Sequence, residues 1–185
     1  MSVEISEGAI VLSVEGERFL KWDDHPAFIQ GIRRLGDTKA VDVCVEVDGE
    51  GAVFIEMKDF RAAAIQNTPR LTSGELAQEV ANKVRDTLAG LVWACARGLS
   101  EPFHESLTRA FIERPKALVV LWLEMDRPDV GGASALQDSI RSLLKPHLVA
   151  KVIVTSTLLE KQSSSPLRWL RARGLPSERI AARKR

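Results

Sequence analysis

Two neighbouring runs of alternating hydrophobic and polar residues predict a β-hairpin in the first third of the chain. In residues 41–47 valine occupies every odd position, and the even positions carry Asp, Cys and Glu. In residues 52–58 the alternation resumes, with Glu56 and Lys58 among the even positions. A period of two residues is typical of strands whose two faces differ. Residues 48–51, Asp-Gly-Glu-Gly, form a turn sequence, so we expect the two strands to pair.

Apolar residues spaced three or four apart predict helices on both sides of this hairpin. The longest such run covers residues 73–98, and Thr72 and Glu75 have the spacing of a capping box at its start. A shorter helix is expected over residues 26–34, and another over residues 101–114, where a proline stands near each end. The hairpin is therefore expected to carry helices on its surface.

The second half of the chain predicts a β-α-β unit. The uninterrupted apolar run 117–123 indicates a strand that is covered on both faces. A helical stripe follows and ends at Pro146, and residues 151–155 form a further strand. A crossover helix places its two strands parallel. Together with a short strand over residues 9–14, this predicts the α/β class, with a mixed β-sheet, a central antiparallel hairpin and flanking helices.

A change of composition near residue 163 predicts the end of the main domain. Residues 163–166, Ser-Ser-Ser-Pro, are a linker sequence, and beyond them seven Arg and Lys residues stand against one Glu. We therefore expect one domain over residues 1–162 and a basic helical extension over residues 163–185. The extension is a candidate arm for phosphate contacts, and a solvated chain end is the alternative.

The composition excludes several classes of protein. With 45% hydrophobic and 28% charged residues, the 185-residue chain is neither collagen-like nor of low complexity nor disordered. A net charge of +1 means that any anion site must be local. The chain lacks an apolar run of about 20 residues and a secretory leader, so neither membrane binding nor export is expected. Two separate cysteines agree with a reduced, cytoplasmic protein.

The length of the hairpin loop decides which charged residues share a face. Residues directly opposite on antiparallel strands project to the same side of the sheet. A three-residue loop places Asp42 opposite Glu56, so that Asp42, Glu56 and Lys58 share one face. A two-residue loop places Val43 opposite Glu56 and sends Asp42 to the other face. A site that uses all three residues therefore requires a loop of odd length.

Two carboxylates and an ammonium group on one face of a central hairpin have two interpretations. Burying an unpaired charge costs several kcal/mol, so the three groups need partners. They can form an ordinary salt bridge on a wet sheet face. Alternatively, the carboxylates hold a hard divalent cation such as Mg²⁺, and the ammonium group faces a reacting phosphate or its water. The order of the residues along the chain favours the second interpretation.

The order Asp42, thirteen residues, then Glu56-Met57-Lys58, followed by a helix and a strand, resembles the PD-(D/E)XK nuclease superfamily. In that superfamily an Asp on one central strand precedes an acidic-x-Lys tripeptide on the next. The resemblance covers residues 36–98 and is closest to a bacterial subgroup that bears this signature. It implies a restriction-endonuclease-like core and a nuclease that hydrolyses phosphodiester bonds of nucleic acid, DNA more often than RNA.

The resemblance also implies roles for individual residues. Asp42 and Glu56 would bind Mg²⁺ or Mn²⁺, with the backbone carbonyl of Met57 as a third ligand. Lys58 would position or help deprotonate the attacking water and offset the charge that grows on the phosphorus centre. Many members carry a further Glu on the helix before the hairpin, which residues 26–34 lack. Glu17 is the nearest acidic substitute, and Gln30 is the nearest polar one.

The helix over residues 73–98 adds polar candidates that would support the site. By the period of 3.6 residues, Gln78 and Arg85 flank one side of its apolar stripe, while Glu79 and Lys83 flank the other. The sequence does not say which side meets the hairpin, and a solvated helix face is the alternative for each residue. The supporting candidates are Gln78, Asn82, Lys83 and Arg85. Arg61 and Arg70, just beyond the Lys58 strand, are candidate phosphate contacts.

Two functions remain open after these observations. The first is a metal-dependent nuclease, which the intact set of Asp42, Glu56 and Lys58 supports. The second is a catalytically inactive protein on the nuclease fold, serving as a nucleic-acid-binding or assembly module, because a fold does not dictate a function. The missing helix Glu and the near-neutral charge support the module. We favour the nuclease, expect nucleic acid as its partner, and leave the oligomeric state open, a homodimer included.

Overall fold

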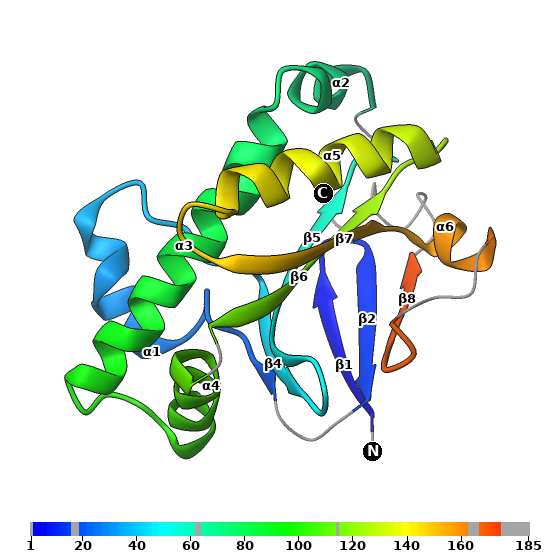
Figure 1. Cartoon of the computed structure of the whole chain (residues 1–185). Coiled ribbons are helices and arrows are strands. Elements are labelled where there is room, and N and C mark those ends of the chain that lie inside the picture. Colours follow the sequence, from blue (N-terminus) through cyan, green and yellow to red (C-terminus); the bar gives the residue numbers. More distant parts are fainter. Residues whose placement is uncertain (1, 16–18, 62–63, 114, 163–166, 175–185) are drawn as a thin grey trace, which may run out of the picture.

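Two β-sheets form the framework of the computed structural model, which describes residues 2–15, 19–61, 64–113, 115–162 and 167–174 (Figure 1). The larger sheet has five strands in the order β3-β4-β5-β6-β7, and the smaller has the order β1-β2-β8. The larger sheet consists of β3 (Phe19–Leu20), β4 (Val43–Val47), β5 (Gly51–Asp59), β6 (Lys116–Glu124) and β7 (Val149–Thr155). The smaller sheet consists of β1 (Ser2–Glu7), β2 (Ile10–Glu15) and β8 (Leu170–Gly174).

The five-stranded sheet is mixed, as the sequence predicted. β4 pairs with β5 in antiparallel fashion, whereas β5, β6 and β7 run parallel to one another. The helix between β6 and β7 makes the crossover of the predicted β-α-β unit. The α/β class, the mixed sheet and the hairpin within it are thus confirmed.

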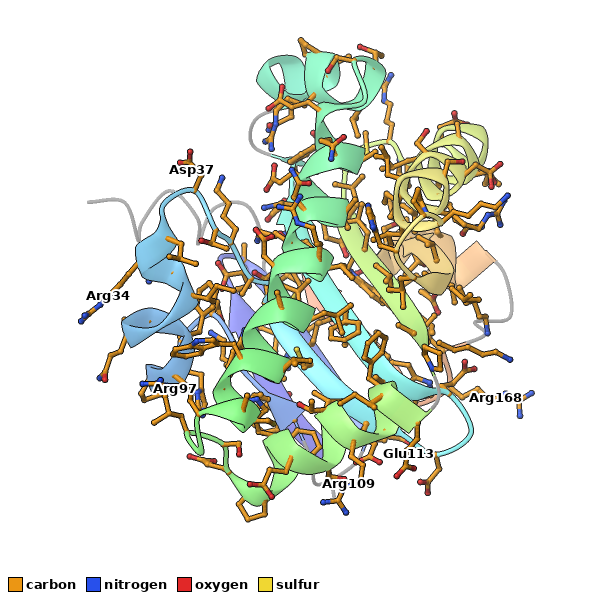
Figure 2. The ribbon with its side chains drawn as sticks, turned by 60° about the vertical axis from the view of Figure 1, so that its left-hand side comes forward. Arg34, Asp37, Arg97, Arg109, Glu113 and Arg168 are labelled. Atoms are coloured by element: carbon orange, nitrogen blue, oxygen red, sulfur yellow. The ribbon has the colours of Figure 1, made fainter. Side chains whose placement is uncertain are left out.

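Seven helical segments follow or separate these strands in the described part of the chain. They are α1 (Pro26–Gln30), the 3₁₀ helix η1 (Ile32–Leu35), α2 (Ala64–Thr72), α3 (Glu75–Ala96), α4 (Pro102–Glu113), α5 (Val130–Leu144) and α6 (Thr157–Gln162). Figure 2 shows α3 crossing the large sheet, with charged side chains such as Arg34, Arg97 and Arg109 spread around the periphery. None of these helices is both long enough and apolar enough to span a membrane.

The two faces of the large sheet are covered differently. One face packs against α1, α3, α4 and α5, with Phe54 of β5 and Leu121 of β6 in this interface. The other face packs against the small sheet, with Val53 and Ile55 of β5 in the interface. The alternation of β5 therefore separates two apolar layers. Because the helical face also carries Glu56 and Lys58, the charged residues of β5 lie under helices.

The starts and ends of two helices differ from the sequence prediction. The helix expected over residues 26–34 breaks at Gly31, and a 3₁₀ helix follows the break. The capping box at Thr72 is wrong, because Thr72 ends α2 and its hydroxyl group donates to the carbonyls of Thr68 and Pro69. α3 begins instead after Gly74, whose φ of 81° is a conformation that favours glycine.

The C-terminal extension was predicted to be helical, and its described part is not. Residues 170–174 form β8, which pairs with β2 in antiparallel fashion. Leu167 and Leu170 are buried between the two sheets, and Arg173 contacts Glu4 at the surface. Burial of the leucines and a free edge of β2 favour the strand over a separate basic helix. The linker 163–166 and residues 175–185 lie outside the described residues.

Candidate functional site

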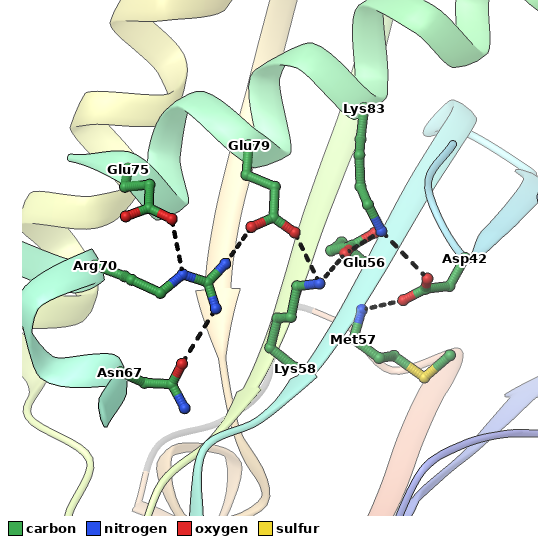
Figure 3. A network of polar contacts seen from close by, with 9 residues as sticks. All are labelled: Asp42, Glu56, Met57, Lys58, Asn67, Arg70, Glu75, Glu79 and Lys83. Atoms are coloured by element: carbon green, nitrogen blue, oxygen red, sulfur yellow. Dashed lines mark hydrogen bonds and ion pairs between the residues drawn. The ribbon is translucent and has the colours of Figure 1, made fainter. Parts of the chain in front are cut away.

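The hairpin has the odd loop length that the candidate site requires. Val43 is paired with Ile55, and Val47 with Gly51, so three residues form the loop. Continued by one residue, this register places Asp42 opposite Glu56. Asp42, Glu56 and Lys58 lie on the same side of the sheet, facing α3 (Figure 3). The geometric prediction from the sequence is therefore confirmed.

Helix α3 places a second lysine between the two carboxylates. The ammonium nitrogen of Lys83 lies 2.5 Å from Oε1 of Glu56 and 3.6 Å from Oδ1 of Asp42. Lys83 is therefore the one helix candidate that enters the site. Its ammonium group stands between the two carboxylates that a shared cation would contact.

Lys58 extends the network toward a third carboxylate. Its ammonium nitrogen lies 2.9 Å from Oε1 of Glu56 and 2.9 Å from Oε1 of Glu79. Oε1 of Glu56 thus contacts two ammonium groups, one from its own strand and one from α3. Although burial on its own lowers the pKa of Lys58, the charges and hydrogen bonds of Glu56 and Glu79 raise that pKa above its ordinary value. Lys58 is held in its charged form.

Arg70 of α2 fixes Glu79 from the side away from Lys58. One of its terminal nitrogens bonds Oε2 of Glu79, and Nε lies 3.2 Å from Oε1 of Glu75. The other terminal nitrogen donates to Asn67 at 3.1 Å (Figure 3). Burial alone raises the pKa of Glu79, but Lys58 and Arg70 lower it below its ordinary value. The contacts from Lys58 through Glu79 to Arg70 connect the strand to two helices.

Glu56 is the most buried and least satisfied carboxylate of this network. Its side chain is 0% exposed, and among the described residues its Oε2 has no hydrogen-bond partner. Burial raises the pKa of Glu56 to about 7, and the charge of Asp42 adds to the rise, whereas Lys83 and Lys58 act in the opposite direction. A buried carboxylate oxygen without a partner is costly, so this atom has capacity for a proton, a water or a cation.

Backbone contacts hold Asp42 in place from the other side. Oδ2 of Asp42 accepts a hydrogen bond from the backbone amide of Met57 at 2.7 Å. The amide of the preceding Val41 donates to the hydroxyl group of Thr87 on α3 at 3.0 Å. These two contacts fix the position of Asp42. The role of the Met57 carbonyl as a metal ligand stays a prediction, while the Met57 amide orients Asp42.

Several residues that the sequence predicted for the site bond to partners outside it. Gln78 donates to Asn82 at 2.9 Å on the exposed side of α3, and Arg85 pairs with the neighbouring Asp86. Neither pair contacts the hairpin carboxylates. The structure therefore shows no contact that would support the predicted roles of Gln78, Asn82 and Arg85. Arg61 pairs with Asp59 at the end of its own strand, 2.7 Å away. The last candidate, Glu17, lies outside the described residues.

Glu79 is the residue that the site predictions missed. It stands four residues before Lys83, so both side chains lie on one side of α3. That spacing was visible in the sequence, but the side of the helix that meets the hairpin was not. Arg70, predicted as a phosphate contact, lies in this same network and is neutralised by Glu79 and Glu75.

The arrangement offers hard oxygen donors beside fixed positive charges. Asp42 and Glu56 are the carboxylates that could hold a cation, because Glu79 is committed to Lys58 and Arg70. Across the described ranges, no group of three or more His, Cys, Asp or Glu side chains has the geometry of a metal site. A cation bound here would share two protein carboxylates and complete its shell with water or substrate oxygens, as Mg²⁺ commonly does.

Comparison with known proteins adds no relative to this picture. No family model, no curated protein and no solved structure matches the chain.

Proposed function

We propose that the chain is a metal-dependent nuclease with a restriction-endonuclease-like core of the PD-(D/E)XK type. The observation that carries the proposal is the meeting of Asp42 and Glu56 on one buried face, with an oxygen of Glu56 left without a partner. Lys58 follows on the same face, at the position that this nuclease signature requires. Carboxylate oxygens are the ligands that Mg²⁺ and Mn²⁺ prefer, so the donor set fits the expected cofactor.

Each residue of the site has its own role in the proposed hydrolysis of a phosphodiester bond. Asp42 and Glu56 would hold the divalent ion, which when bound supplies Lewis-acid stabilisation of a phosphate oxygen. Lys58 stays charged, orients the attacking water and offsets the negative charge that develops at phosphorus. Glu79 and Arg70 position Lys58, because they fix the third carboxylate that its ammonium group contacts. Lys83 must leave the carboxylates when the cation arrives.

A second function is favoured by the position of Lys83. Its ammonium group bridges Asp42 and Glu56 and so neutralises the pair without any metal. In a nucleic-acid-binding or assembly module on the same fold, this contact would be permanent and structural. The two functions differ in one measurable property, which is whether a divalent cation displaces Lys83.

Calorimetric titration with Mn²⁺, combined with cleavage assays on single- and double-stranded DNA and RNA, tests the proposal. We expect wild type to bind Mn²⁺ and to cleave at least one substrate in a metal-dependent manner. Asp42→Asn should abolish metal binding and cleavage, while its melting temperature stays the same or rises. The substitution removes charge repulsion with Glu56 and keeps an oxygen for the Met57 amide.

Asp138→Asn is the matched control, because Asp138 is an exposed carboxylate on α5 whose partner is Arg141. It should leave metal binding and cleavage unchanged. A loss of ~3–5 kcal/mol of stability in Asp42→Asn would instead indicate a structural ion pair, because it would mean that a buried charge had been stranded. Wild type that binds Mn²⁺ and cleaves none of the four substrates would favour the module.

A further inference from the structure

An apolar pocket opens at the carboxyl ends of β6 and β7, between the α2–α3 junction and α5. Its volume is about 540 Å³, within the range of ~300–1,000 Å³ that is typical of small-molecule sites. Leu123, Leu136 and Val154 line its inner part, and small residues such as Ala77 and Ala133 leave the space open. In open α/β sheets, ligands commonly bind outside the carboxyl ends of parallel strands.

The pocket lies beside the candidate catalytic site. Leu123 of β6 is the register partner of Lys58, and neighbouring strands lie about 4.8 Å apart. Both side chains lie on the helical face of the sheet. On α2, Arg70 directly precedes Leu71, which lines the pocket. Lys58, whose ammonium group also contacts Glu56 and Glu79, therefore lies next to an apolar space.

The polar groups of the pocket are already engaged within the protein. The hydroxyl group of Ser139 donates to the carbonyl of Ala135 at 2.9 Å, and that of Thr155 donates to Glu160 at 2.8 Å. The carboxylate of Asp129 accepts from the two backbone amides at the start of α5. The lining thus favours an apolar group and imposes no particular hydrogen-bond pattern on it.

We propose that this pocket receives one unpaired base of the nucleic-acid strand whose phosphate lies at Lys58. The inference rests on the proposed function and adds its substrate class, which is single-stranded or locally unpaired nucleic acid. A nucleotide joins an anionic phosphate to a base through a sugar, and a phosphate held at Lys58 would bring that base to the neighbouring apolar pocket. A base inside a duplex is stacked and paired, so it cannot enter without being extruded.

Binding of two short strands, measured without divalent metal so that no cleavage occurs, tests the proposal. The first strand is an eight-nucleotide oligothymidylate, and the second is an abasic phosphodiester strand of the same length and charge. We expect wild type to bind the first about tenfold more tightly in fluorescence anisotropy, which corresponds to the burial of roughly 60 Å² of apolar base surface. Equal affinity for the two strands, or no measurable binding of either, would overturn the proposal.

Variants that fill the pocket locate the effect. Ala133→Phe fills it from a half-buried position of α5, and Ala135→Phe fills it from an exposed position that does not disturb the core. Both should reduce the affinity for oligothymidylate to that for the abasic strand. Ser134→Phe adds the same side chain to an exposed position outside the pocket, and it should bind as wild type does. Retention of the tenfold preference in both filled variants would contradict the proposal.

These outcomes separate the pocket from the proposed catalysis. Base-dependent binding without Mn²⁺-dependent cleavage would reject the nuclease and keep the pocket as the binding site of a module. Cleavage of duplex alone, with no preference for bases over abasic sugars, would reject the pocket and keep the nuclease. A wild-type dimer that Ala133→Phe and Ala135→Phe dissociate, but Ser134→Phe does not, would assign the pocket to a second copy of the chain and overturn the proposal.

Discussion

Glu56 and Glu124 are buried glutamates on neighbouring strands of one sheet, and their surroundings differ in kind. Glu124, 3% exposed, accepts a hydrogen bond from the indole of Trp122 at 2.8 Å. The same oxygen accepts from the backbone amide and the hydroxyl group of Thr157, where α6 begins. Glu56 instead contacts the ammonium groups of Lys58 and Lys83 and keeps one oxygen without a partner.

This difference separates a structural carboxylate from one that is available for chemistry. Glu124 accepts hydrogen bonds from neutral donors whose positions are fixed by the backbone and by an indole ring. These contacts connect α6 to β6 as part of the fold. Long and flexible lysine side chains hold Glu56, and such partners can exchange for a cation at little cost in geometry. Buried carboxylates with displaced pKa values beside specific charged partners are typical of functional sites.

The largest effect is expected for Lys58→Ala. This change removes the group that orients water and stabilises developing charge, which is worth ~10²–10³ in rate. Mn²⁺ affinity should stay the same or increase, because a neighbouring positive charge is lost. Single-turnover cleavage and calorimetry measure the two properties separately. Lys151→Ala, an exposed lysine paired with Glu50, is the control, and undiminished cleavage by Lys58→Ala would refute the mechanism.

Glu124→Ala should be the most destabilising change outside the site. It leaves the Trp122 indole and the Thr157 donors without an acceptor in a buried place, and we expect a loss of ~2–4 kcal/mol in the free energy of unfolding. Glu124→Gln keeps an acceptor oxygen and should lose less. Metal binding should survive in both variants. Urea denaturation measures the free energies of unfolding. A loss of Mn²⁺ binding in Glu124→Gln would contradict the distinction between a structural Glu124 and a metal-binding Glu56.

The stability of wild type should fall as the pH rises from 5 to 8. The folded-state pKa of Glu56 lies at about 7, above its ordinary value of 4.5. Between these values the unfolded carboxyl group is ionised while the folded one keeps its proton, so stability is lost across this window and levels off above it. The expected loss from Glu56 is roughly 2–3 kcal/mol.

The same measurement on Glu56→Gln isolates this contribution. Burial also raises the pKa of Asp23 to about 6, so Asp23 gives a pH dependence of the same sign. The test therefore compares the free energies of unfolding of wild type and Glu56→Gln, measured by urea denaturation at pH 5, 6, 7 and 8. If the two proteins show the same slope, Glu56 is ionised throughout and its ion pairs are structural.

A smaller effect is expected for Lys83→Met. Removing the ammonium group that contacts both carboxylates takes away the competitor of the cation, so Mn²⁺ affinity should increase about tenfold. Arg85→Met lies two residues further along α3, contacts Asp86 instead and should leave the affinity unchanged. Calorimetric titration of both variants decides the point. Weaker Mn²⁺ binding by Lys83→Met would mean that Lys83 belongs to the metal-binding form.

Local patterns predicted the parts of the site that belong to one hairpin. Alternation left two arrangements of the hairpin, and the three-residue loop of the structure is the one that places Asp42, Glu56 and Lys58 on a common face. A different rule, that a crossover helix joins parallel strands, predicted the parallel strands around α5. The capping box at Thr72 was wrong because α2 extends through that residue. The helical prediction for the C-terminal extension was wrong for residues 170–174, which pair with β2 as strand β8.

The sequence by itself determined the set of charged residues on β5 and the two possible sides of α3. Only the tertiary structure decided that the side with Glu79 and Lys83, rather than the side with Gln78 and Arg85, faces the hairpin. A helix with one apolar stripe can rotate by a fraction of a turn and still bury it, so the choice depends on packing against the sheet. Burial of Leu76, Val80 and Val84 in the core sets that rotation and brings Lys83 to the carboxylates.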